Sequence, residues 1–338
     1  MDLRLGDVHN FGKRTAAIVV DGQTIFLKPR PVFWEYFFFG AESPLLPIFE
    51  RDLVLKDLSD LFVLKVDRPL ETRGGSVHLL AESSMGKLSW RLFGMLNAYC
   101  TFFGLSDLHA NNLVRRDSAF VPVDIECAFM PMLLPNETGL LPHRTYKTAH
   151  CIFHKISGNG FTSVDFADLF NGFRDCMIAL ISSEGLKEFL SSRHSLLSSV
   201  PIRILLRPSA DYSSACASGN FTEFFPEEKI QLSRGDIPYF YTTLQTQKLF
   251  YYADEKYEVA EFEYIDPRFF SRGRAVALPD ILLRRQRCET LLASSLLWLT
   301  ARLPSGPLRL SQPGYSVVRS QDDVRLSLGP RDYIARLR

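Results

Sequence analysis

Residues 106–126 (SDLHANNLVRRDSAFVPVDIE) carry the pattern that most constrains how this chain can fold. Asp107 and Asn112 lie five positions apart, a spacing that puts both side chains at one end of a tight loop. The apolar run FVPV predicts a strand, and this strand delivers Asp124 to the same place. The fold must therefore bring a polar loop and the end of a strand together.

These residue types in this order suit phosphoryl transfer. Such enzymes use one Asp to orient and deprotonate the attacking hydroxyl, and an Asn and a second Asp to hold a metal. Asp107 is therefore predicted as the base, and Asn112 and Asp124 as Mg²⁺ ligands. We expect His109 to orient Asp107 or to contact the transferring phosphate, and Glu126 to complete a metal site. The alternative is a polar loop built from Asx turns.

Charge and cysteine content exclude several classes of function. The 39 Lys and Arg residues balance the 38 Asp and Glu residues, so we expect no binding to nucleic acid or to a membrane. Cys151 and His154 have ligand-like spacing but no second pair, so we expect free thiols and no zinc site. There is no N-terminal apolar signal region, and the run FWEYFFFG is too short to span a bilayer and is interrupted by Glu35. We expect a cytoplasmic protein, with delivery into a host cell left open.

Apolar periodicity and turn residues outline the expected elements. Apolar runs flanking Asp21-Gly22 predict a β-hairpin over 15–28, and helical spacing predicts a helix over 79–103 that leads into the Asp107 loop. The other predicted elements are a strand over 61–66, one or two helices over 162–200 broken near Gly185, a buried strand over 202–209, a helix over 279–303 with Pro279 at its first position, and two short strands, YSVV and VRLSL, in the tail.

Two further groups of residues lie near the hairpin. Lys28 ends the second predicted strand, where a lysine contacts nucleotide phosphates in kinase-like enzymes. Asp7, His9 and Asn10 precede the hairpin in a turn that contains glycine. This turn either covers the phosphates or is a polar turn with capping side chains, and the sequence leaves both open.

The segment IRILLRPSADY carries Arg203, Arg207 and Ser209. On a strand, Arg203 and Arg207 share a face, and two guanidinium groups on one face form a phosphate clamp in which Arg207 contacts the nucleotide. The alternative is a pair of surface arginines that balance nearby carboxylates. The residues alone favour the alternative.

Four blocks together resemble a known family. They are LGDVHNFGKRTAAIVVDGQTIFLKPR, SDLHANNLVRRDSAFVPVDIE, IRILLRPSADY and QLSRGDIPYF, and they extend from about residue 5 to 240. In this order they are similar to the dehydratase domain of class II lanthipeptide synthetases (the LanM type). The combination of D-x-H-N, K-P-R, D-L-H-x-x-N and D-x-E carries the resemblance.

The resemblance implies a fold and an activity. The fold is α+β and two-lobed, like a lipid kinase, with a β-rich N-lobe over about 1–100 and a mainly helical C-lobe over about 101–338 that contains an elimination segment, 202–212. The chain would form a single catalytic unit, 1–338. It would use ATP and Mg²⁺ to phosphorylate Ser or Thr of a peptide or protein, and would then eliminate phosphate to leave dehydroalanine or dehydrobutyrine.

The resemblance also implies roles for individual residues. Lys28 would bind ATP phosphate, and Arg203 and Ser209 would serve elimination, with Ser209 in the place of the family's Thr. The remaining positions are Asp107 and His109 for phosphoryl transfer, Asn112, Asp124 and Glu126 for metal binding and phosphoryl transfer, and Asp7 and His9 for a pair near the phosphates.

The chain departs from the family in what it lacks. The family carries a large region before D-x-H-N and a cyclase domain with Cys/Cys/His zinc ligands. We therefore expect a minimal, stand-alone kinase–lyase that performs no thioether cyclisation. Its expected partners are a precursor peptide or protein substrate and a separate cyclase or downstream enzyme. A kinase without lyase activity, on a peptide, protein or small molecule, and a pseudokinase-like binding module are the alternatives.

Overall fold

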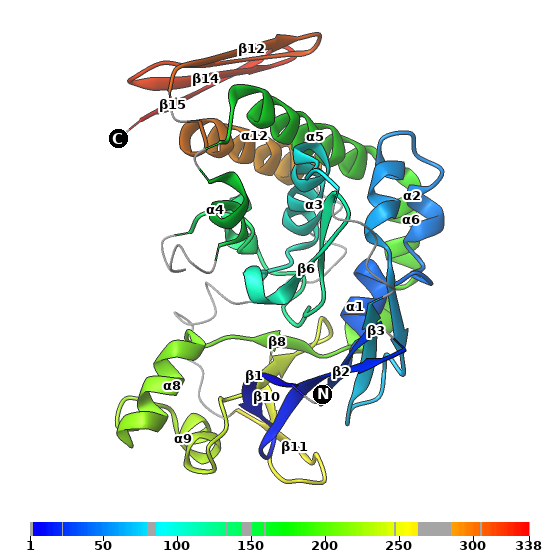
Figure 1. Ribbon diagram of the computed structural model, residues 1–338, viewed down its shortest axis with the longest axis vertical. Coiled ribbons are helices and arrows are strands. Elements are labelled where there is room, and N and C mark those ends of the chain that lie inside the picture. Colours follow the sequence, from blue (N-terminus) through cyan, green and yellow to red (C-terminus); the bar gives the residue numbers. More distant parts are fainter. Residues whose placement is uncertain are drawn as a thin grey trace.

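The computed structural model describes residues 3–21, 23–79, 86–132, 134–143, 151–158, 160–246, 248–262, 285–304 and 306–337. The protein is a mixed α+β structure, as the sequence predicts (Figure 1). Within those residues, no helix combines the length and the apolar character needed to cross a bilayer.

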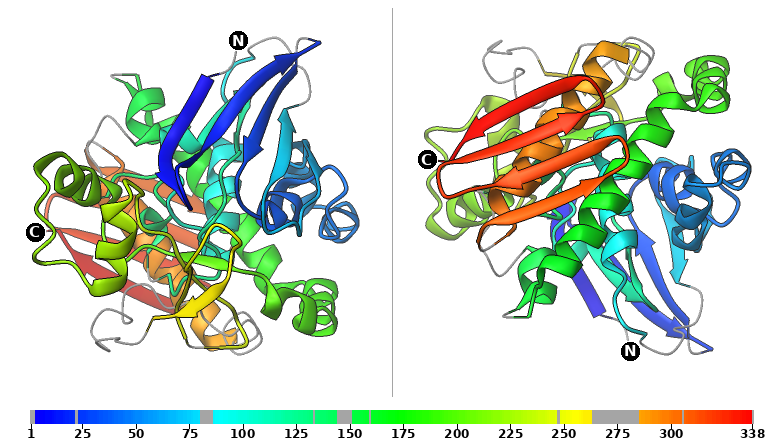
Figure 2. Two further views of the ribbon diagram at one scale, coloured as in Figure 1. Left: turned by 90° about the horizontal axis from the view of Figure 1, so that it is seen from below. Right: turned by 90° about the horizontal axis from the view of Figure 1, so that it is seen from above.

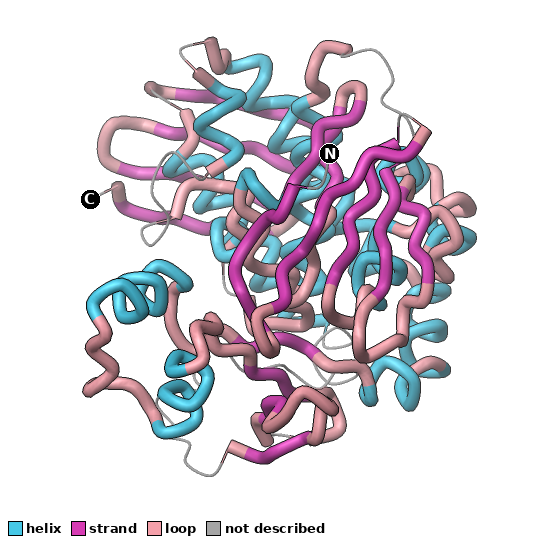
Figure 3. Tube along the Cα trace, turned by 60° about the horizontal axis from the view of Figure 1, so that its bottom comes forward, coloured by secondary structure: helices cyan, strands magenta, loops and turns pink. Residues whose placement is uncertain are grey.

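A five-stranded antiparallel sheet forms the N-terminal part of the fold (Figure 3). Its strands, in spatial order, are β1 (Leu3–His9), β2 (Lys13–Val20), β3 (Gln23–Lys28), β5 (Gly75–Leu79) and β4 (Leu64–Asp67). The predicted hairpin is confirmed, because β2 pairs with β3 across a turn in which Asp21 adopts φ 52°. The strand predicted over 61–66 corresponds to β4, but it starts only at Leu64, because Leu61 ends a 3₁₀ segment.

Helix α1 (Phe33–Phe39) contributes aromatic side chains to the main core. Five of its seven residues are buried aromatics, and these include Trp34 and Phe38, which pack against Phe129 from a distant segment. Glu35 is also fully buried in this helix, which requires partners for its charge. The short α2 (Leu46–Phe49) and the 3₁₀ segment η1 (Leu55–Leu61) follow.

The central helices pack at unusually close range. Helices α3 (Trp90–Phe103) and α5 (Ser163–Ser182) meet where Gly94 and Gly172 face the other helix's backbone. A Cβ on Gly94 would lie 2.1 Å from the carbonyl oxygen of Leu169, and one on Gly172 would lie 2.0 Å from that of Arg91. Only glycine at both positions allows this approach. Helix α12 (Arg285–Arg302) packs beside α5.

The helix boundaries refine the sequence predictions. The helix predicted over 79–103 begins at Trp90, where Ser89 Oγ accepts a hydrogen bond from the backbone N–H of Leu92 at 3.2 Å. The region 162–200 forms three helices, α5, α6 (Glu184–Ser192) and α7 (His194–Ser199). The break lies at Ser183 because its side chain caps α6. The predicted Pro279 start of the last helix lies outside the described residues.

A hairpin and short helices connect these layers. The hairpin joins β6 (Leu113–Arg116) to β7 (Ala119–Pro122) and follows the 3₁₀ turn η2 (Ala110–Asn112). The 3₁₀ turn η3 (Pro135–Thr138) and helix α4 (Ile152–Ser157) come next.

A second sheet lies below the helices in Figure 1. Its strands are β11 (Val259–Glu261), β10 (Phe250–Tyr252), β9 (Phe240–Thr242) and β8 (Ile202–Ile204), with α8 (Ser209–Ser218) and α9 (Pro226–Ser233) beside it. The prediction of a strand over 202–209 is wrong in length. The strand ends at Ile204, because the chain leaves the sheet and starts α8 directly after Pro208.

The C-terminal residues form a four-stranded antiparallel sheet that lies across α12 (Figure 2). Its strands are β12 (Leu308–Gln312), β13 (Tyr315–Arg319), β14 (Asp323–Leu328) and β15 (Arg331–Arg336). The two predicted tail strands are β13 and β14. In one row, Leu310, Val317, Leu326 and Tyr333 stand in register across the sheet and pack on the main core.

Candidate active site

A cluster of charged side chains lies where β3, α1, the segment after β7 and β8 meet. We call it the ionic cluster. Its members are Lys28, Arg30, Glu35, Asp124, Glu126 and Arg203. Three cations and three carboxylates balance one another, which allows burial of charges that could not be buried alone.

Lys28 and Arg30 enter the cluster from the end of β3. Lys28 is only 4% exposed, and its Nζ lies 3.3 Å from Glu35 Oε1 and also contacts Asp124. Pro29 and Pro31 stop the strand here, because neither has an N–H for a ladder hydrogen bond. The chain then turns into α1, which places Glu35 back under Lys28.

Arg30 uses every N–H donor that its guanidinium group has. Its Nε donates to Glu126 Oε1 at 2.7 Å, and its Nη1 donates to the Pro31 carbonyl at 2.7 Å and to Glu35 Oε2 at 3.3 Å. Its Nη2 donates to Glu35 Oε1 at 2.6 Å and to Asp124. Arg30 therefore fixes three carboxylates relative to one another.

Asn112 and Asp124 stand at the open end of the β6–β7 hairpin. Asn112 comes directly before β6, and the backbone N–H of Val123 donates to its carbonyl oxygen at 2.9 Å. The hairpin therefore brings Asn112 and Asp124 close together in space although they are twelve residues apart in sequence. The side chain of Asp124 is 31% exposed, and Lys28 and Arg30 both contact the same oxygen, Oδ1. Two cations of the cluster therefore hold Oδ1 of Asp124.

Glu126 joins β8 to the rest of the cluster. Its Oε2 accepts a hydrogen bond from Arg203 at 2.7 Å, and its backbone carbonyl accepts one from the Arg203 N–H at 2.9 Å. Its Oε1 is paired with Arg30. Because both oxygens of Glu126 accept from guanidinium groups, a cation bound to Glu126 would share these oxygens with Arg30 and Arg203.

The charges of the cluster set the ionisation of its carboxylates. Burial alone would raise the pKa of Asp124, but Lys28 and Arg30 outweigh burial and lower it far below its usual range. Burial likewise opposes the charge of Glu126, and Arg203 and Arg30 lower its pKa. Both groups are therefore carboxylates at neutral pH.

His9 lies next to Arg203. Its Nδ1 donates to the Ile237 carbonyl at 2.7 Å, so Nε2 carries the lone pair, and Arg203 Nη2 lies 3.3 Å from it. Burial and then the positive charge of Arg203 lower the pKa of His9 to about 4. His9 is therefore neutral at neutral pH. Asp7 lies close enough for its charge to act on His9 in the opposite direction.

Asp107 faces the same region from the loop after α3. It adopts φ 63°, and its carbonyl accepts a hydrogen bond from Asn112 Nδ2 at 2.8 Å. This bond turns the oxygen of the Asn112 amide to the opposite side. The charge of Asp107 contributes to the raised pKa of Arg203, where burial acts the other way and Glu126 contributes most. His109 caps the turn η2 through Nδ1, which lies 3.3 Å from the Asn111 N–H.

Two predicted site residues lie elsewhere. Arg207 donates to Glu228 at 3.2 Å and to the Glu223 carbonyl at 2.9 Å, and it lies over the ring of Phe224. The clamp of Arg203 and Arg207 on one strand face does not form, because the strand ends between them, and Arg207 pairs with a carboxylate as in the alternative that the residues alone favour. Ser209 begins α8, where its carbonyl accepts a hydrogen bond from Ser213 at 3.0 Å.

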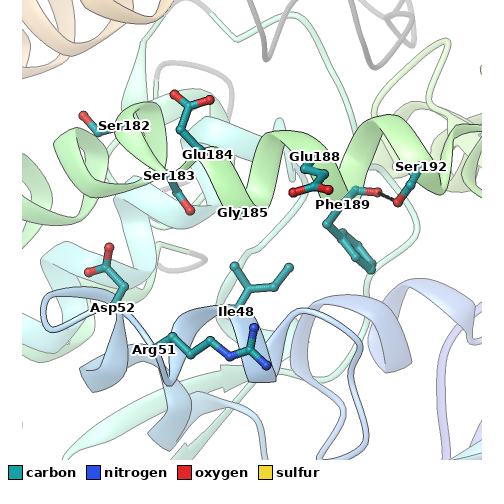
Figure 4. Close-up of a pocket in the computed structure, with 10 residues that line it drawn as sticks. All are labelled: Ile48, Arg51, Asp52, Ser182, Ser183, Glu184, Gly185, Glu188, Phe189 and Ser192. Atoms are coloured by element: carbon teal, nitrogen blue, oxygen red, sulfur yellow. Dashed lines mark hydrogen bonds between the residues drawn. The ribbon is translucent and has the colours of Figure 1, made fainter.

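The residues near Asp124 provide oxygen ligands of the kind Mg²⁺ prefers, a carboxylate and an amide. In the part of the chain that the structure describes, no group of three or more His, Cys, Asp or Glu side chains forms a metal cage. A cation here would therefore depend on phosphate oxygens as well as on Asp124 and Asn112. A pocket of about 580 Å³ lies elsewhere, between residues of α2 and the segment after it and residues of α5 and α6. Figure 4 shows the residues that line it, and none of them belongs to the ionic cluster.

The sequence reasoning missed two members of the ionic cluster, Arg30 and Glu35. Both left a signal. Arg30 stands between two prolines after a strand, and Glu35 is the only charged residue in an aromatic run. A lone acid in an apolar helix needs a buried cation nearby, and the preceding K-P-R segment supplies two.

No protein-family model matches the chain, and no curated protein matches it either.

Proposed function

We propose that this protein is a kinase and phospho-Ser/Thr lyase that dehydrates Ser or Thr of a peptide or protein, as class II lanthipeptide synthetases do. The single observation that carries the proposal is that Arg203 and Lys28 belong to one ionic cluster, together with Asp124 and Glu126. Arg203 is expected to serve elimination, whereas Lys28 and Asp124 are expected to serve phosphorylation. Both steps then have their residues in one place.

The proposal includes a two-lobed, kinase-like arrangement. The five-stranded sheet and α1 would form the N-lobe, and the helices from α3 onward the C-lobe. A contact typical of kinases supports this, namely the pair between Lys28 at the end of a strand and Glu35 on the following helix, 3.3 Å apart. This pair holds Lys28 where it can bind phosphate oxygens of ATP.

Phosphorylation would proceed between Lys28 and Asp107. Asp107 takes the proton of the substrate hydroxyl, whose oxygen forms a bond to the γ-phosphorus as the bond to the ADP oxygen breaks. Asn112 and Asp124 would hold Mg²⁺, which neutralises the charge that develops on the phosphate oxygens when it is bound. Arg30 keeps Asp124 and Glu126 in place, and Lys28 contributes a fixed positive charge.

Elimination would use Arg203. A base removes the Cα proton, its electrons form the Cα–Cβ double bond, and the Cβ–O bond breaks to release inorganic phosphate. The departing group carries close to two negative charges at neutral pH. Arg203 remains cationic because Glu126 and Asp107 raise its pKa against the effect of burial. It therefore offers a permanent positive charge to the leaving phosphate.

A kinase without lyase activity is the second candidate, and the position of Ser209 favours it. Ser209 starts α8, whereas Arg203 points from β8 into the ionic cluster. The two residues expected to act together in elimination therefore stand on different elements. This candidate retains the roles of Lys28, Asp107, Asn112 and Asp124.

The two candidates differ in the product. The test incubates the protein with ATP, Mg²⁺ and a peptide library that carries a central Ser or Thr between random residues, and follows the products by intact-mass spectrometry. We expect loss of one water per modified residue. A phosphopeptide as the sole product supports the kinase alone, and a lack of both products contradicts both candidates. The variant Lys28→Ala is the control, and we expect it to leave the peptide unchanged.

A further inference from the structure

A buried carboxylate holds the turn between β1 and β2. Asp236 is fully buried and lies in the loop between α9 and β9. Its two oxygens accept hydrogen bonds from the backbone N–H groups of Phe11 and Gly12, each at 2.8 Å. These groups are separated from Asp236 by more than two hundred residues in sequence. The bonds therefore join two distant segments.

The conformation of the turn explains why a carboxylate fits. Asn10, Phe11 and Gly12 have φ values of 45°, 70° and 77°, all in the left-handed region. Successive left-handed residues direct neighbouring N–H groups to one side, which creates a small site for an anion. Asp236 occupies this site. The N–H groups of Phe11 and Gly12 are thus bound to Asp236, which favours the polar-turn interpretation of this segment over a turn that covers phosphates.

Neighbouring residues complete what we call the clasp, the contacts between residues 8–12 and 234–237. Arg234 Nε donates to Asp236 at 2.6 Å, and its guanidinium group lies 3.8 Å from the centre of the Phe11 ring. The Ile237 N–H donates to the Val8 carbonyl at 2.6 Å. The Ile237 carbonyl accepts from His9 Nδ1 at 2.7 Å. The clasp therefore sets both the position of β1 and the orientation of the His9 ring.

The clasp leads directly to the ionic cluster. His9 Nε2 lies 3.3 Å from Arg203, and Tyr239, three residues after Asp236, packs edge-on to His9 and lies beneath the Arg203 guanidinium group. One side of His9 is fixed by the clasp and the other meets Arg203. A displacement of the turn would therefore move His9 away from the cation that is expected to act in elimination.

We propose that Asp236 is a positioning residue, which fixes the turn of residues 10–12 and thereby holds His9 against Arg203. This inference rests on the proposed function for its effect on catalysis. The clasp itself does not depend on that function, so it can be tested separately.

The test substitutes Asp236→Asn. The side-chain amide has one acceptor oxygen in place of two, so at least one of the two turn N–H groups loses its partner. We expect amide hydrogen exchange at Phe11 and Gly12 to become at least about tenfold faster. With a phosphoserine peptide library, we expect release of inorganic phosphate to fall roughly tenfold in kcat, with KM for the library little changed.

Asp254→Asn is the matched control. Asp254 also accepts two backbone N–H groups, from Lys256 at 2.9 Å and Glu258 at 3.0 Å, but within its own exposed turn. We expect this variant to retain wild-type exchange at Phe11 and Gly12 and wild-type phosphate release.

The outcomes separate the two proposals. Unchanged exchange at Phe11 and Gly12 in Asp236→Asn overturns the clasp. Faster exchange with unchanged phosphate release overturns the positioning role. If the wild type releases no phosphate, the proposed lyase function fails, while amide exchange still decides on the clasp. If Asp236→Asn does not fold, Arg234→Gln takes its place, because it removes one donor to Asp236 and the cation over Phe11 and leaves the carboxylate present.

Discussion

Arg203 and Arg207 stand four residues apart, and each pairs with a glutamate whose side chain is at most 13% exposed, yet they belong to different networks. Arg203 reaches Glu126, whose second oxygen binds Arg30 and so connects four segments of the chain. Arg207 reaches Glu228, which also accepts from Tyr212 at 2.6 Å and from the Phe225 N–H at 2.8 Å. The second network joins only α8 and the segment directly before it to α9.

The difference lies in what each network offers to a ligand. The ionic cluster includes Asp124, with a side chain 31% exposed, and lies beside the neutral His9. Glu228 is fully enclosed, and three donors satisfy its oxygens. An ion pair alone therefore does not indicate a site. A buried network with one accessible group is a candidate site, and a closed network is part of the framework.

Replacing the two arginines is the strongest test of this comparison. We expect Arg203→Ala to lower phosphate elimination roughly 10²-fold or more, because the leaving phosphate loses its fixed cation, so phosphopeptide accumulates. We expect Arg207→Ala to keep the dehydrated product. It should lower the free energy of unfolding by about 3 kcal/mol, because Glu228 remains buried without its cation. Intact-mass spectrometry and urea unfolding measure the two effects. Equal dehydration by both variants would contradict the assignment.

Arg30→Lys sharpens the comparison by testing geometry without a change in charge. A lysine ammonium group has three donors and cannot reproduce the five bonds of Arg30. We expect phosphorylation to fall roughly 10- to 100-fold, because Asp124 and Glu126 lose their fixed separation. Steady-state kinetics with the Ser/Thr library gives the measurement. Arg207→Lys is the control, and activity close to wild type in both variants would show that Arg30 only balances charge.

Ser209→Ala tests a residue that stands two positions after Arg207 in sequence. The family resemblance predicts that its hydroxyl serves elimination, so we expect a roughly tenfold loss of phosphate release and accumulation of phosphopeptide. Ser213→Ala, one turn further along α8, is the control, since its hydroxyl bonds only to the carbonyl of Ser209 among its described contacts. Unchanged dehydration by Ser209→Ala would leave Arg203 as the elimination residue and assign Ser209 to the start of the helix.

The smallest expected effect is a pH dependence of the free energy of unfolding, which arises from His9 beside Arg203. The pKa of His9 in the folded protein is about 4, below the ordinary value of 6.5 that it has when unfolded. The unfolded chain therefore binds more protons, and stability falls as pH drops from 6.5 toward 4. Between pH 7.5 and pH 5 we expect a loss on the order of 1 kcal/mol, given the partial exposure of His9. Urea unfolding of wild type and His9→Asn at both pH values measures it, and an equal loss in the two proteins would contradict this attribution.

The sequence determined the local parts of the structure. Turn residues and alternating apolar positions are local signals, so the hairpin over β2 and β3, the position of Lys28 and the two tail strands were predictable. The spacing of Asn112 and Asp124 was also sufficient to predict that they lie close together, because a short hairpin between them brings both residues to its open end. The break before α6 was predicted near Gly185 and lies two residues earlier, at the capping residue Ser183.

Only the tertiary structure decided which charged residues meet. Arg203 and Arg207 have the same chemistry and similar neighbours in sequence, and nothing local shows that the strand ends at Ile204. The partners Glu126 and Glu228 lie at very different separations along the chain, and their choice depends on how β8, α8 and α9 pack. The same holds for Glu35 and Asp236. A buried carboxylate must have hydrogen-bond donors or cations as partners. The sequence indicates that such partners are required, but the packing of distant segments decides which residues provide them.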